Sequence, residues 1–398
     1  MTPRSGHPIL KPVDHTVDRY DLGIVGGGQL GRMLALAAAP LGLRCIVLDP
    51  DPACAAAQVA DTIVAPLNDA KALHRLVTSA AVTTFEIEHT APAVLSSLED
   101  TGATIRPSPR TLAVVADKLR QKETLREAGL PVPVILARTA PGRSSWTHPV
   151  VQKSRFGGYD GRGVAVVPGG EDMPLPGDTF VETAVEIERE LAVLVVRDTD
   201  GVVDAWAPVD MVFDSTLNLV SDVIVPAEIP EEVRRRAVEI SIATARVLGE
   251  HGLVGVLAVE LFLDRSGRIL INEVAPRPHN SGHITMESSQ CDQFEQHVRA
   301  VLGLPLGSTA LRTPAAMTNI VGPPHSHSGA YRVIGRRQVL ADPTAHLHLY
   351  GKPAVRPGRK MGHVTCTDPS TADALSRART AAAAVAFAPS AQAKGDVQ

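Results

Sequence analysis

The segment from Leu257 to His283, LAVELFLDRSGRILINEVAPRPHNSGH, constrains the fold more than any other part of the sequence. Its apolar residues alternate at first, the run breaks at Asp264-Arg265-Ser266-Gly267, and a second apolar run starts at Ile269. Two short runs of this kind around a glycine-containing turn predict an antiparallel β-hairpin.

The predicted hairpin contains two glutamates, Glu260 and Glu273. A two-residue turn at Ser266-Gly267, or a four-residue turn over 265–268, sets the two directly opposite each other on one face. Like charges so close destabilise a sheet unless a cation lies between them, and Mg²⁺ carrying phosphate oxygens is such a cation. A three-residue turn instead pairs Glu260 with Asn272, and two solvated glutamates on an edge hairpin are the alternative to a metal site.

A dense run of polar residues follows the hairpin, just before a helix that we predict from about 284 to 302. Loops of this kind hold ligands on rigid scaffolds, so we expect a binding site here. The residues are Arg277, His279, Asn280, Ser281 and His283.

Composition excludes several classes of protein. A chain of 398 residues with 44% hydrophobic and 21% charged residues predicts two or three globular domains. The net charge of -4 and 3% aromatic residues argue against nucleic-acid binding. Four scattered cysteines without a CxxC motif favour a reducing cytoplasm, and no apolar run has membrane length. Residues 1–19 lack a signal-peptide pattern and are predicted to be a disordered extension.

The first regular structure is predicted at 20–25, a strand that leads into Gly26-Gly27-Gly28-Gln29-Leu30-Gly31 and a helix over 32–39. A second strand, 44–48, ends at Asp49. This pattern matches the G-x-G-x-x-G dinucleotide fingerprint and predicts a phosphate site. A glycine turn that only brings a helix N-terminus close to its strand is the alternative.

Strand and helix continue to alternate, with strands at 61–65 and 81–87 and a helix at 69–79. Glu86 and Glu88 end the last strand at the edge where open α/β sheets bind ligands. They are candidates for holding a substrate amine or hydroxyl, and a helix N-cap or a solvated strand end is the alternative. An amphipathic helix over 111–128 follows, closed by Gly129.

A second unit is predicted from about 134 to 185. Its strand at 150–153 leads into a loop at 156–163 with four glycines, whose amides can wrap phosphates while Lys153 supplies charge. A plain connector is the alternative. A large antiparallel domain is predicted to start at 186.

The C-terminal part carries a cluster of cations, Lys352, Arg356, Arg359 and Lys360, which is either an anion pocket or a solvated loop. His325/His327 and His346/His348 lack nearby cysteines or acids and are predicted to be exposed or strand histidines, not metal ligands. The Ala-rich stretch from 381 is predicted to be a flexible tail.

Together, these segments resemble the ATP-grasp superfamily and, within it, the N5-carboxyaminoimidazole ribonucleotide synthase family. The resemblance covers about Asp21 to Thr367. It is carried by GGGQLGR at 26–32, FEIEH at 85–89, GGYDGRG at 157–163, INEVAPRPHNSGH at 271–283, and HLYGK (348–352) with RPGRKMGH (356–363).

The resemblance implies an α/β and α+β ATP-grasp fold. Its expected parts are a Rossmann-like substrate-binding domain at 20–110, a linker helix with a small lid domain at 111–185, and a large antiparallel-sheet domain with a C-terminal subdomain at 186–380. The implied ligands are ATP, Mg²⁺, bicarbonate and 5-aminoimidazole ribonucleotide. A homodimer is implied as well.

The resemblance also assigns residues to these ligands. The two hairpin glutamates would hold Mg²⁺, in agreement with the register argument. The ATP site would comprise Lys118, Lys153, Gly157, Gly158, Glu182, Val185, Glu190 and Asn272. The ribonucleotide site would comprise Gly28, Gln29, Leu30, Glu86, Arg162, Ser281, Lys352 and Arg359. The catalytic groups would be Arg277, His279 and Asn280 around bicarbonate, with Tyr159 and Asp160 closing over the ribonucleotide.

The reaction implied by the resemblance is attack of bicarbonate on the γ-phosphate, giving carboxyphosphate and ADP, followed by capture of the carboxyl group or released CO₂ by the exocyclic amine. The glycine loop would exclude water. The sequence departs from relatives at Ala275, where many ATP-grasp enzymes carry an asparagine, and at Lys118, which can be arginine.

Three rival interpretations remain open from sequence. Another ATP-grasp ligase, such as a formate-dependent glycinamide ribonucleotide transformylase, would share most motifs. A nicotinamide dehydrogenase built on 26–49 would leave Lys153, Glu260 and Glu273 without a role. A nucleotide-binding regulatory relative would have less need of the paired glutamates and the glycine loop.

Overall fold

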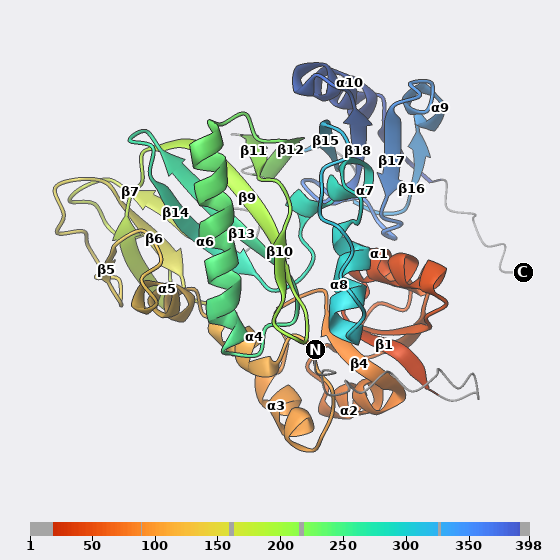
Figure 1. Cartoon of the computed structure of the whole chain (residues 1–398). Helices are drawn as coiled ribbons and strands as arrows, with labels where there is room; N and C mark the ends of the chain where they lie inside the picture. The colour runs from red at the N-terminus through yellow and green to blue at the C-terminus, as the bar shows by residue number, and fades with distance from the viewer. Residues whose placement is uncertain (1–18, 89, 159–162, 215–218, 325–327, 391–398) are drawn as a thin grey trace, which may run out of the picture.

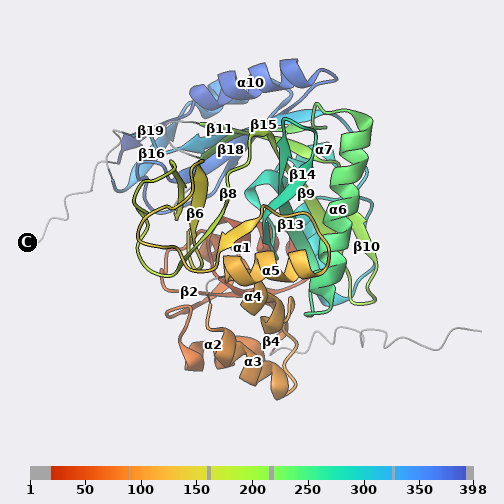
Figure 2. The same cartoon turned by 90° about the vertical axis from the view of Figure 1, so that its left-hand side faces the viewer.

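The computed structural model describes residues 19–88, 90–158, 163–214, 219–324 and 328–390. The chain runs from an N-terminal α/β unit through a small antiparallel sheet into a large antiparallel sheet, and the C-terminal elements pack at the far end of that sheet (Figures 1 and 2). The predicted mixture of α/β and α+β structure is confirmed.

The N-terminal unit is a parallel sheet with strand order β3-β2-β1-β4. Its central strand β1 is buried over its last four residues, as expected of a strand with helices on both faces. Helix α1 starts at Gln29, three residues earlier than predicted, because the glycine turn already belongs to the helix N-terminus. The elements are β1 Tyr20–Val25, α1 Gln29–Ala38, η1 Ala39–Leu41, β2 Cys45–Asp49, η2 Ala55–Gln58, β3 Asp61–Val64, α2 Ala70–Ser79, β4 Ala80–Phe85 and α3 Pro92–Asp100.

The single helix predicted over 111–128 is wrong. The structure has two helices, α4 (Pro109–Val115) and α5 (Lys118–Glu127). Asp117 separates them because it adopts extended backbone angles and its carboxylate accepts hydrogen bonds from the amides of Leu119 and Arg120, which makes it the N-cap of α5. The predicted C-cap at Gly129 is confirmed by its left-handed φ of 77°.

The small antiparallel sheet has the strand order β5-β8-β6-β7. The loop between β6 and β7 is the glycine-rich segment, and it is described at Gly157, Gly158 and Gly163, all of which have positive φ angles. The strands are β5 Ile135–Ala137, β6 Val150–Ser154, β7 Val164–Val167 and β8 Thr179–Thr183.

The large sheet runs in the order β14-β13-β9-β11-β12-β15-β18-β17, with β10 paired to β9. Every pairing in it is antiparallel, as predicted for this part of the chain. The strands are β9 Ile187–Arg197, β10 Val203–Ala205, β11 Val209–Asp214, β12 Leu219–Val225, β13 Gly255–Asp264, β14 Ile269–Ala275, β15 Ala315–Val321, β17 Ala345–Leu349 and β18 Lys360–Thr367.

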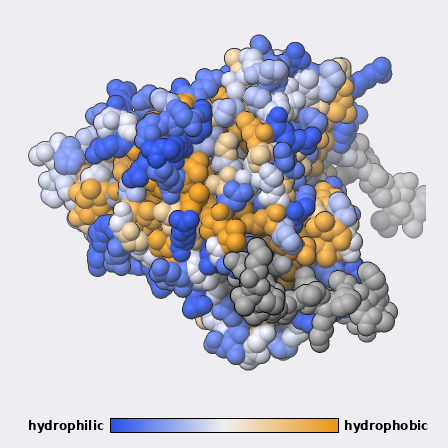
Figure 3. Space-filling model, in the orientation of Figure 1, coloured by the Kyte–Doolittle hydropathy of each residue, from blue (hydrophilic) through white to orange (hydrophobic). Residues whose placement is uncertain are grey.

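Two helices cover opposite faces of this sheet. Helix α6 (Glu231–Gly249) packs Ala237 and Ile240 against the same cluster as Val193 and Leu257. Helix α8 (Gln293–Leu302) packs on the other face and also against α1, so it joins the N-terminal unit to the large sheet. Figure 3 shows hydrophilic side chains over much of the face crossed by α6 and a group of hydrophobic ones near its middle.

The helix predicted over 284–302 is also divided. A single 3₁₀ turn, η3 (Asn280–Gly282), and a short helix α7 (Thr285–Ser288) precede α8. The chain leaves the helical conformation at Ser289, and Asp292 restarts it as the N-cap of α8 through hydrogen bonds from Phe294 and Glu295.

The C-terminal elements extend beyond the predicted boundary. Helix α10 (Thr371–Ala383) packs on β15 and β18, and β19 (Ala386–Pro389) pairs with β16 (Tyr331–Ile334). The prediction of a flexible tail is therefore wrong for 381–389. A short helix α9 (Arg336–Val339) completes the set. Among the described residues, no helix is both long and apolar enough to cross a membrane.

Candidate active site

The register of the β13–β14 hairpin places Glu260 opposite Glu273, as predicted, but by a different route. The turn has three residues, 265–267, closed by a 2.9 Å hydrogen bond from the Asp264 amide to the Arg268 carbonyl. Near the turn, Leu261 pairs with Ile271, a register that would pair Glu260 with Asn272. A β-bulge between Glu260 and Leu261 shifts the register by one residue and restores the pair of glutamates.

The bulge also brings Asn272 to the face that carries the glutamates. Two residues of a bulged strand oppose one residue of its partner, and both Asn272 and Glu273 are half-buried where strict alternation would bury one of them. The Asn272 side chain lies 3.4 Å from Glu260 and accepts a 2.8 Å hydrogen bond from Lys153. The two-residue and four-residue turns predicted from the sequence are therefore wrong, while the pairing derived from them is confirmed.

The two glutamates differ in protonation. Burial, and then the nearby Glu273 and Glu190 carboxylates, raise the pKa of Glu260 to about 8. Burial acts in the same direction on Glu273, but the Lys118 ammonium forms an ion pair with it and holds the pKa of Glu273 below its usual range. At neutral pH the pair is thus expected to carry one negative charge, on Glu273, which the Lys118 ammonium offsets.

A second, deeper ionic cluster lies behind the hairpin. Glu182 of β8 is 2% exposed and lies between Lys153 (2.8 Å) and Lys122 (3.1 Å). Burial acts to raise the pKa of Glu182, but the two ammonium groups more than offset it and lower this pKa. Burial, followed by repulsion from Lys153, lowers the pKa of Lys122 to about 7. Lys122 is absent from the sequence prediction, although its place one helical turn after Lys118 puts both on one face of α5.

Glu190 and Val185, both predicted at the ATP site, lie on the segment that enters the large sheet. Glu190 is a half-buried residue of β9 opposite Phe262, and burial raises its pKa to about 7. Val185 is half-buried just before β9, and its carbonyl accepts a hydrogen bond from Ile187.

Arg277 is anchored to the N-terminal unit by Glu88. Its Nε and Nη2 atoms donate to the two carboxylate oxygens of Glu88, at 2.6 and 3.1 Å. Burial acts to lower the pKa of Arg277, but the Glu88 carboxylate outweighs it and raises this pKa, so the guanidinium stays charged. From the sequence, Glu88 was considered as a substrate ligand, a helix N-cap or a solvated strand end, and this role was missed.

His279 follows the hairpin with its ring between two partners. Its Nδ1 accepts hydrogen bonds from the Ser281 hydroxyl at 2.9 Å and from the Ser281 amide at 3.4 Å. Because a backbone amide only donates, Nδ1 carries no proton, and the neutral ring is protonated on Nε2. Nε2 lies 3.4 Å from Glu260 Oε1. Burial, and then repulsion from Arg277 and Lys360, lower the pKa of His279 to about 3, so the ring is neutral at physiological pH.

The side chain of Asn280 is fixed by hydrogen bonds to Asn319 of β15. Their side-chain amides form two reciprocal hydrogen bonds of 3.0 and 2.9 Å. Because one lone pair of each amide oxygen remains, Asn280 still presents an acceptor beside the cavity.

The glycine-rich turn at 26–31 is occupied by a carboxylate of the protein itself. Glu86 accepts hydrogen bonds from the amides of Gly28 and Gly31, the latter at 2.6 Å, and Asp49 accepts one from Gly27 at 2.8 Å. These amides and this acid are the groups that bind pyrophosphate and ribose in a dinucleotide fold. The dehydrogenase interpretation is therefore contradicted, and Glu86 serves as a helix cap for α1 as well as facing the cavity.

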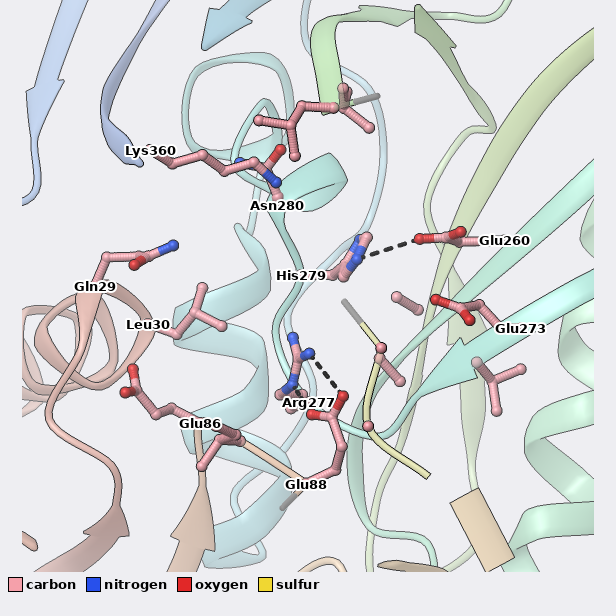
Figure 4. Close-up of a pocket in the computed structure, with 18 of the residues that line it drawn as sticks. Gln29, Leu30, Glu86, Glu88, Glu260, Glu273, Arg277, His279, Asn280 and Lys360 are labelled. Carbon is pink, nitrogen blue, oxygen red and sulfur yellow. Dashed lines mark hydrogen bonds and ion pairs between the residues drawn. The ribbon is translucent and has the colours of Figure 1, made fainter. Parts of the chain in front are cut away.

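These groups meet at a cavity of about 780 Å³. In Figure 4, Arg277 and His279 lie between the hairpin glutamates on one side and Gln29, Leu30 and Glu86 on the other. The predicted site residues that line it are Gln29, Leu30, Glu86, Lys118, Gly157, Gly158, Glu260, Glu273, Arg277, His279, Asn280, Lys352 and Arg359.

The other predicted residues fall into three groups. Lys153, Glu182 and Asn272 lie behind the cavity wall in the ionic cluster, and Gly28 and Ser281 act through Glu86 and His279. Tyr159, Asp160, Arg162 and His89 lie outside the described residues, as do His325 and His327. Lys360, which the sequence analysis placed in the cation cluster as a candidate for an anion pocket, lines the cavity, as does Phe213, which was not predicted. His346 and His348 lie on β17 as predicted, and His348 pairs with Glu287 at 2.7 Å.

An antiparallel lid-like sheet packed beside a larger antiparallel sheet, with lysines and paired carboxylates at their junction, defines an ATP-grasp protein. The ATP-grasp domain model matches residues 136–294, after a ribonucleotide synthetase preATP-grasp domain at 20–116. A phosphoribosylaminoimidazole carboxylase C-terminal domain matches residues 315–377.

Individual relatives narrow this class. N5-carboxyaminoimidazole ribonucleotide synthase of Synechococcus elongatus is 39% identical over 370 residues, 89% of this chain and 90% of the relative. The Thermotoga maritima synthetase structure superimposes with a TM-score of 0.84 at 40% identity, covering 93% of this chain and all of that one. The Aspergillus clavatus synthase, solved with ADP and 5-aminoimidazole ribonucleotide, has a TM-score of 0.80 at 30% identity over 92% of this chain and 98% of its own. The chain belongs to the N5-carboxyaminoimidazole ribonucleotide synthase family.

Proposed function

We propose that the 780 Å³ cavity is the place where this chain, a C–N ligase of purine biosynthesis by its family, carboxylates 5-aminoimidazole ribonucleotide with ATP and bicarbonate. The product is N5-carboxyaminoimidazole ribonucleotide, with ADP and phosphate released. The observation that supports this location best is the meeting of three kinds of group in one space: paired carboxylates, a charged arginine beside a neutral histidine, and a cluster of cations.

ATP is proposed to lie between the small and the large sheet. Lys118 lines the cavity next to Glu273, and Lys153 lies one layer deeper, so both ammonium groups are near enough to turn toward phosphate oxygens. Gly157 and Gly158 line the same cavity with positive φ angles, a geometry in which backbone amides cradle phosphates. The base and ribose would then lie toward the segment with Glu182, Val185 and Glu190.

The hairpin pair fits a divalent cation. Glu260 and Glu273 supply oxygen donors from directly paired positions, which suits a hard divalent cation. Burial, and then the neighbouring Glu273 and Glu190 carboxylates, raise the pKa of Glu260, and a cation bound between the two glutamates would relieve this repulsion. Mg²⁺ held by these two carboxylates would neutralise charge that develops on the transferring phosphoryl group. Ala275 supplies no ligand of its own, so water and nucleotide oxygens would complete the coordination shell.

Bicarbonate is proposed to bind at Arg277 and His279. The Arg277 guanidinium is charged and oriented by Glu88, which suits it for holding an anion. His279 offers an Nε2–H donor without a competing positive charge. Asn280 lines the cavity beside them.

The ribonucleotide is proposed to bind across the N-terminal unit. Lys352 and Arg359 line the cavity and provide cations for its phosphate, with Arg356 and Lys360 as neighbours. Gln29 and Leu30 present the start of α1, and Glu86 keeps lone pairs beyond its two amide bonds for a ribose hydroxyl or amine.

The reaction joins these sites in sequence. A bicarbonate oxygen attacks the γ-phosphorus and ADP leaves, which gives carboxyphosphate. In the direct route the exocyclic amine attacks the carboxyl carbon, the C–O bond to phosphate breaks as the C–N bond forms, and phosphate takes up the proton of the amine. In the other route carboxyphosphate first breaks into CO₂ and phosphate, and the amine then adds to CO₂ and gives its proton to that phosphate. Because carboxyphosphate hydrolyses readily, closure of the glycine-rich loop over the cavity is proposed to exclude water.

The decisive experiment is Mg²⁺-dependent ADP release from ATP and bicarbonate, with and without 5-aminoimidazole ribonucleotide. Glu273→Ala is expected to lower the stimulated rate by about 100-fold or more, the scale seen when one charge-stabilising group is removed. Glu188→Ala, at an exposed glutamate of β9, is the control and is expected to keep the wild-type rate.

Lack of stimulation by the ribonucleotide in the wild-type protein would contradict the proposal. Stimulation by formate and glycinamide ribonucleotide instead would favour the rival ATP-grasp ligase. NAD is expected not to raise the thermal unfolding temperature, because Glu86 and Asp49 occupy the groups it would need. The homodimer remains a prediction, and sedimentation analysis of the purified protein would measure its oligomeric state.

A further inference from the structure

Gln293, the first residue of α8, is a fully buried polar side chain bonded to the backbone of His279. Its Oε1 accepts a hydrogen bond from the His279 amide, and its Nε2 donates one to the His279 carbonyl, each 2.8 Å long. One side-chain amide thus satisfies both polar groups of a single residue, as a neighbouring β-strand would.

The orientation of this amide is unambiguous. A backbone N–H only donates and a carbonyl only accepts, so the oxygen and nitrogen of Gln293 cannot be exchanged. The second hydrogen on Nε2 points to Nδ1 of His283, 3.1 Å away. His283 Nδ1 is therefore an acceptor, and the neutral ring of His283 carries its proton on Nε2.

The surroundings hold this arrangement in place. The His283 ring is fully buried and stacks on Phe294 and His363, with centroids 5.5 and 4.9 Å away. Gly282 is required for the approach of Gln293, because a Cβ atom there would lie 2.3 Å from Gln293 Oε1.

We propose that Gln293 is a positioning residue for His279, with its amide oriented by His283. His279 has extended backbone angles (φ -131°, ψ 157°) at the entrance to a single 3₁₀ turn, so few local hydrogen bonds fix its peptide plane. By clamping the amide and carbonyl, Gln293 sets the direction of the imidazole, whose Nε2 faces Glu260. The consequence for catalysis rests on the proposed function of His279 at the bicarbonate site.

Helix α8 supplies a matched control one turn further on. Gln296 is also fully buried and makes the same double hydrogen bond, with the amide and carbonyl of Gly307, both at 2.7 Å. Gly307 does not line the cavity. Gln293→Glu and Gln296→Glu therefore make the same chemical change at two different backbone segments: the Nε2 amide that donates to a backbone carbonyl is replaced by a carboxylate oxygen that cannot.

The first test compares these two variants by steady-state kinetics. Gln293→Glu is expected to lower kcat for ribonucleotide-stimulated ADP release by about 10-fold or more, since small misplacements of a reacting group are costly. It should raise KM for bicarbonate and leave KM for ATP within about 2-fold. Gln296→Glu is expected to leave kcat and both KM values within about 2-fold of wild type.

The second test reads the histidine tautomer directly by ¹⁵N NMR of labelled imidazoles. In wild-type protein, His283 is expected as the Nε2–H tautomer. In Gln293→Glu the proton is expected to move to Nδ1, where it can be donated to the new carboxylate, while Gln296→Glu leaves the wild-type tautomer unchanged.

A pair of variants at His283 keeps the proposal testable if Gln293→Glu does not fold. His283→Asn retains a carbonyl acceptor near the place of Nδ1, whereas His283→Leu, of similar size, has none. The Asn variant is expected to keep a kcat about 5-fold or more above that of the Leu variant, because a buried donor of Gln293 stays paired.

Three results would overturn the clamp: an Nδ1–H tautomer in wild-type protein, equal kinetic defects in the two glutamine variants, or equal kcat values in the two His283 variants. Failure of the proposed function is distinguishable from these. In that case wild-type protein shows no ribonucleotide-stimulated ADP release, while the tautomer and its change in Gln293→Glu still report on the clamp.

Discussion

Arg277 and Glu88 are 189 positions apart in the sequence, and they form an ion pair with two hydrogen bonds at the junction of the N-terminal unit and the large sheet. The pair is mostly shielded from solvent, with each side chain no more than 20% exposed. Arg277, proposed to hold bicarbonate, is therefore oriented by Glu88 of the N-terminal unit, which is proposed to hold the ribonucleotide. A movement of either substrate site relative to the other would disturb this ion pair.

The substitution Glu88→Gln tests this coupling. The new side-chain amide would keep one acceptor for Arg277 but would remove the countercharge, so we expect the free energy of unfolding to fall by about 1–3 kcal/mol. KM for bicarbonate should rise more than KM for ATP. Urea unfolding followed by circular dichroism, together with ADP-release kinetics, measures both effects.

Glu127→Gln, at an exposed residue near the end of α5, is the control for this charge change and is expected to alter stability by less than about 0.5 kcal/mol. If Glu88→Gln behaved like this control in both assays, Arg277 would not depend on Glu88 for its position.

Gly28→Ala tests the carboxylate that fills the glycine-rich turn. Gly28 has extended backbone angles (φ -72°, ψ -158°) that alanine can adopt, but its Cβ would lie 2.5 Å from Glu86 Oε1. We expect Glu86 to be displaced, with a loss of about 1–3 kcal/mol as its amide partners lose their hydrogen bonds. KM for the ribonucleotide should rise, and thermal unfolding with ribonucleotide titration would detect both effects.

Gly142→Ala is the matched substitution, since a Cβ there meets nothing within 4 Å. It is expected to preserve both stability and KM. Wild-type values in Gly28→Ala would mean that Glu86 can move without cost and has no part in the ribonucleotide site.

Asp264 at the hairpin turn gives a prediction for pH. The Ser266 hydroxyl, supported by the amide and side chain of Arg268, lowers the pKa of Asp264 to about 2. A carboxylate with a lowered pKa in the folded state stabilises it above the unfolded-state pKa, and this stabilisation disappears as the pH falls through the folded-state value. The advantage of wild type over Asp264→Asn should be constant above about pH 4 and shrink toward about pH 2.

Denaturant titrations of both proteins between about pH 2 and about pH 7 measure this difference, with Asp100→Asn, at an exposed residue of α3, as the control. A difference that stays the same down to the acid end of this range would show that Asp264 acts through hydrogen-bonding shape alone and not through its charge.

The predictions that held rest on periodicity and on short polar motifs. The alternation in β13 and β14 was enough to predict the hairpin, because a paired strand repeats every two residues. The glutamate pair was predicted from turn lengths that the structure does not have, and it forms through the bulge, which alternation does not show. The parallel N-terminal strands were predictable as continuous apolar runs after turn signals.

The errors have local physical causes. Periodicity within 111–128 and 284–302 is helical throughout, but Asp117 and Asp292 accept hydrogen bonds from amides two and three residues ahead, and so begin new helices. The clamp by Gln293 and the pairing of Glu88 with Arg277 join distant segments, and a single sequence carries no record of such contacts. Their only sign was the density of polar residues around Arg277 and in FEIEH.

The bulge in β14 also limits how the site could be transplanted. A regular strand offers one side chain per two residues to a given face, whereas this one offers Asn272 and Glu273 in succession opposite Glu260. A designer who grafts the three residues onto a regular hairpin would keep the glutamate pair and turn the asparagine, with its link to Lys153, to the opposite side. The transferable unit is therefore the bulged backbone together with its residues. Deleting one residue next to Asn272 would remove the bulge, and the glutamate pair and the asparagine that binds Lys153 would no longer share one face.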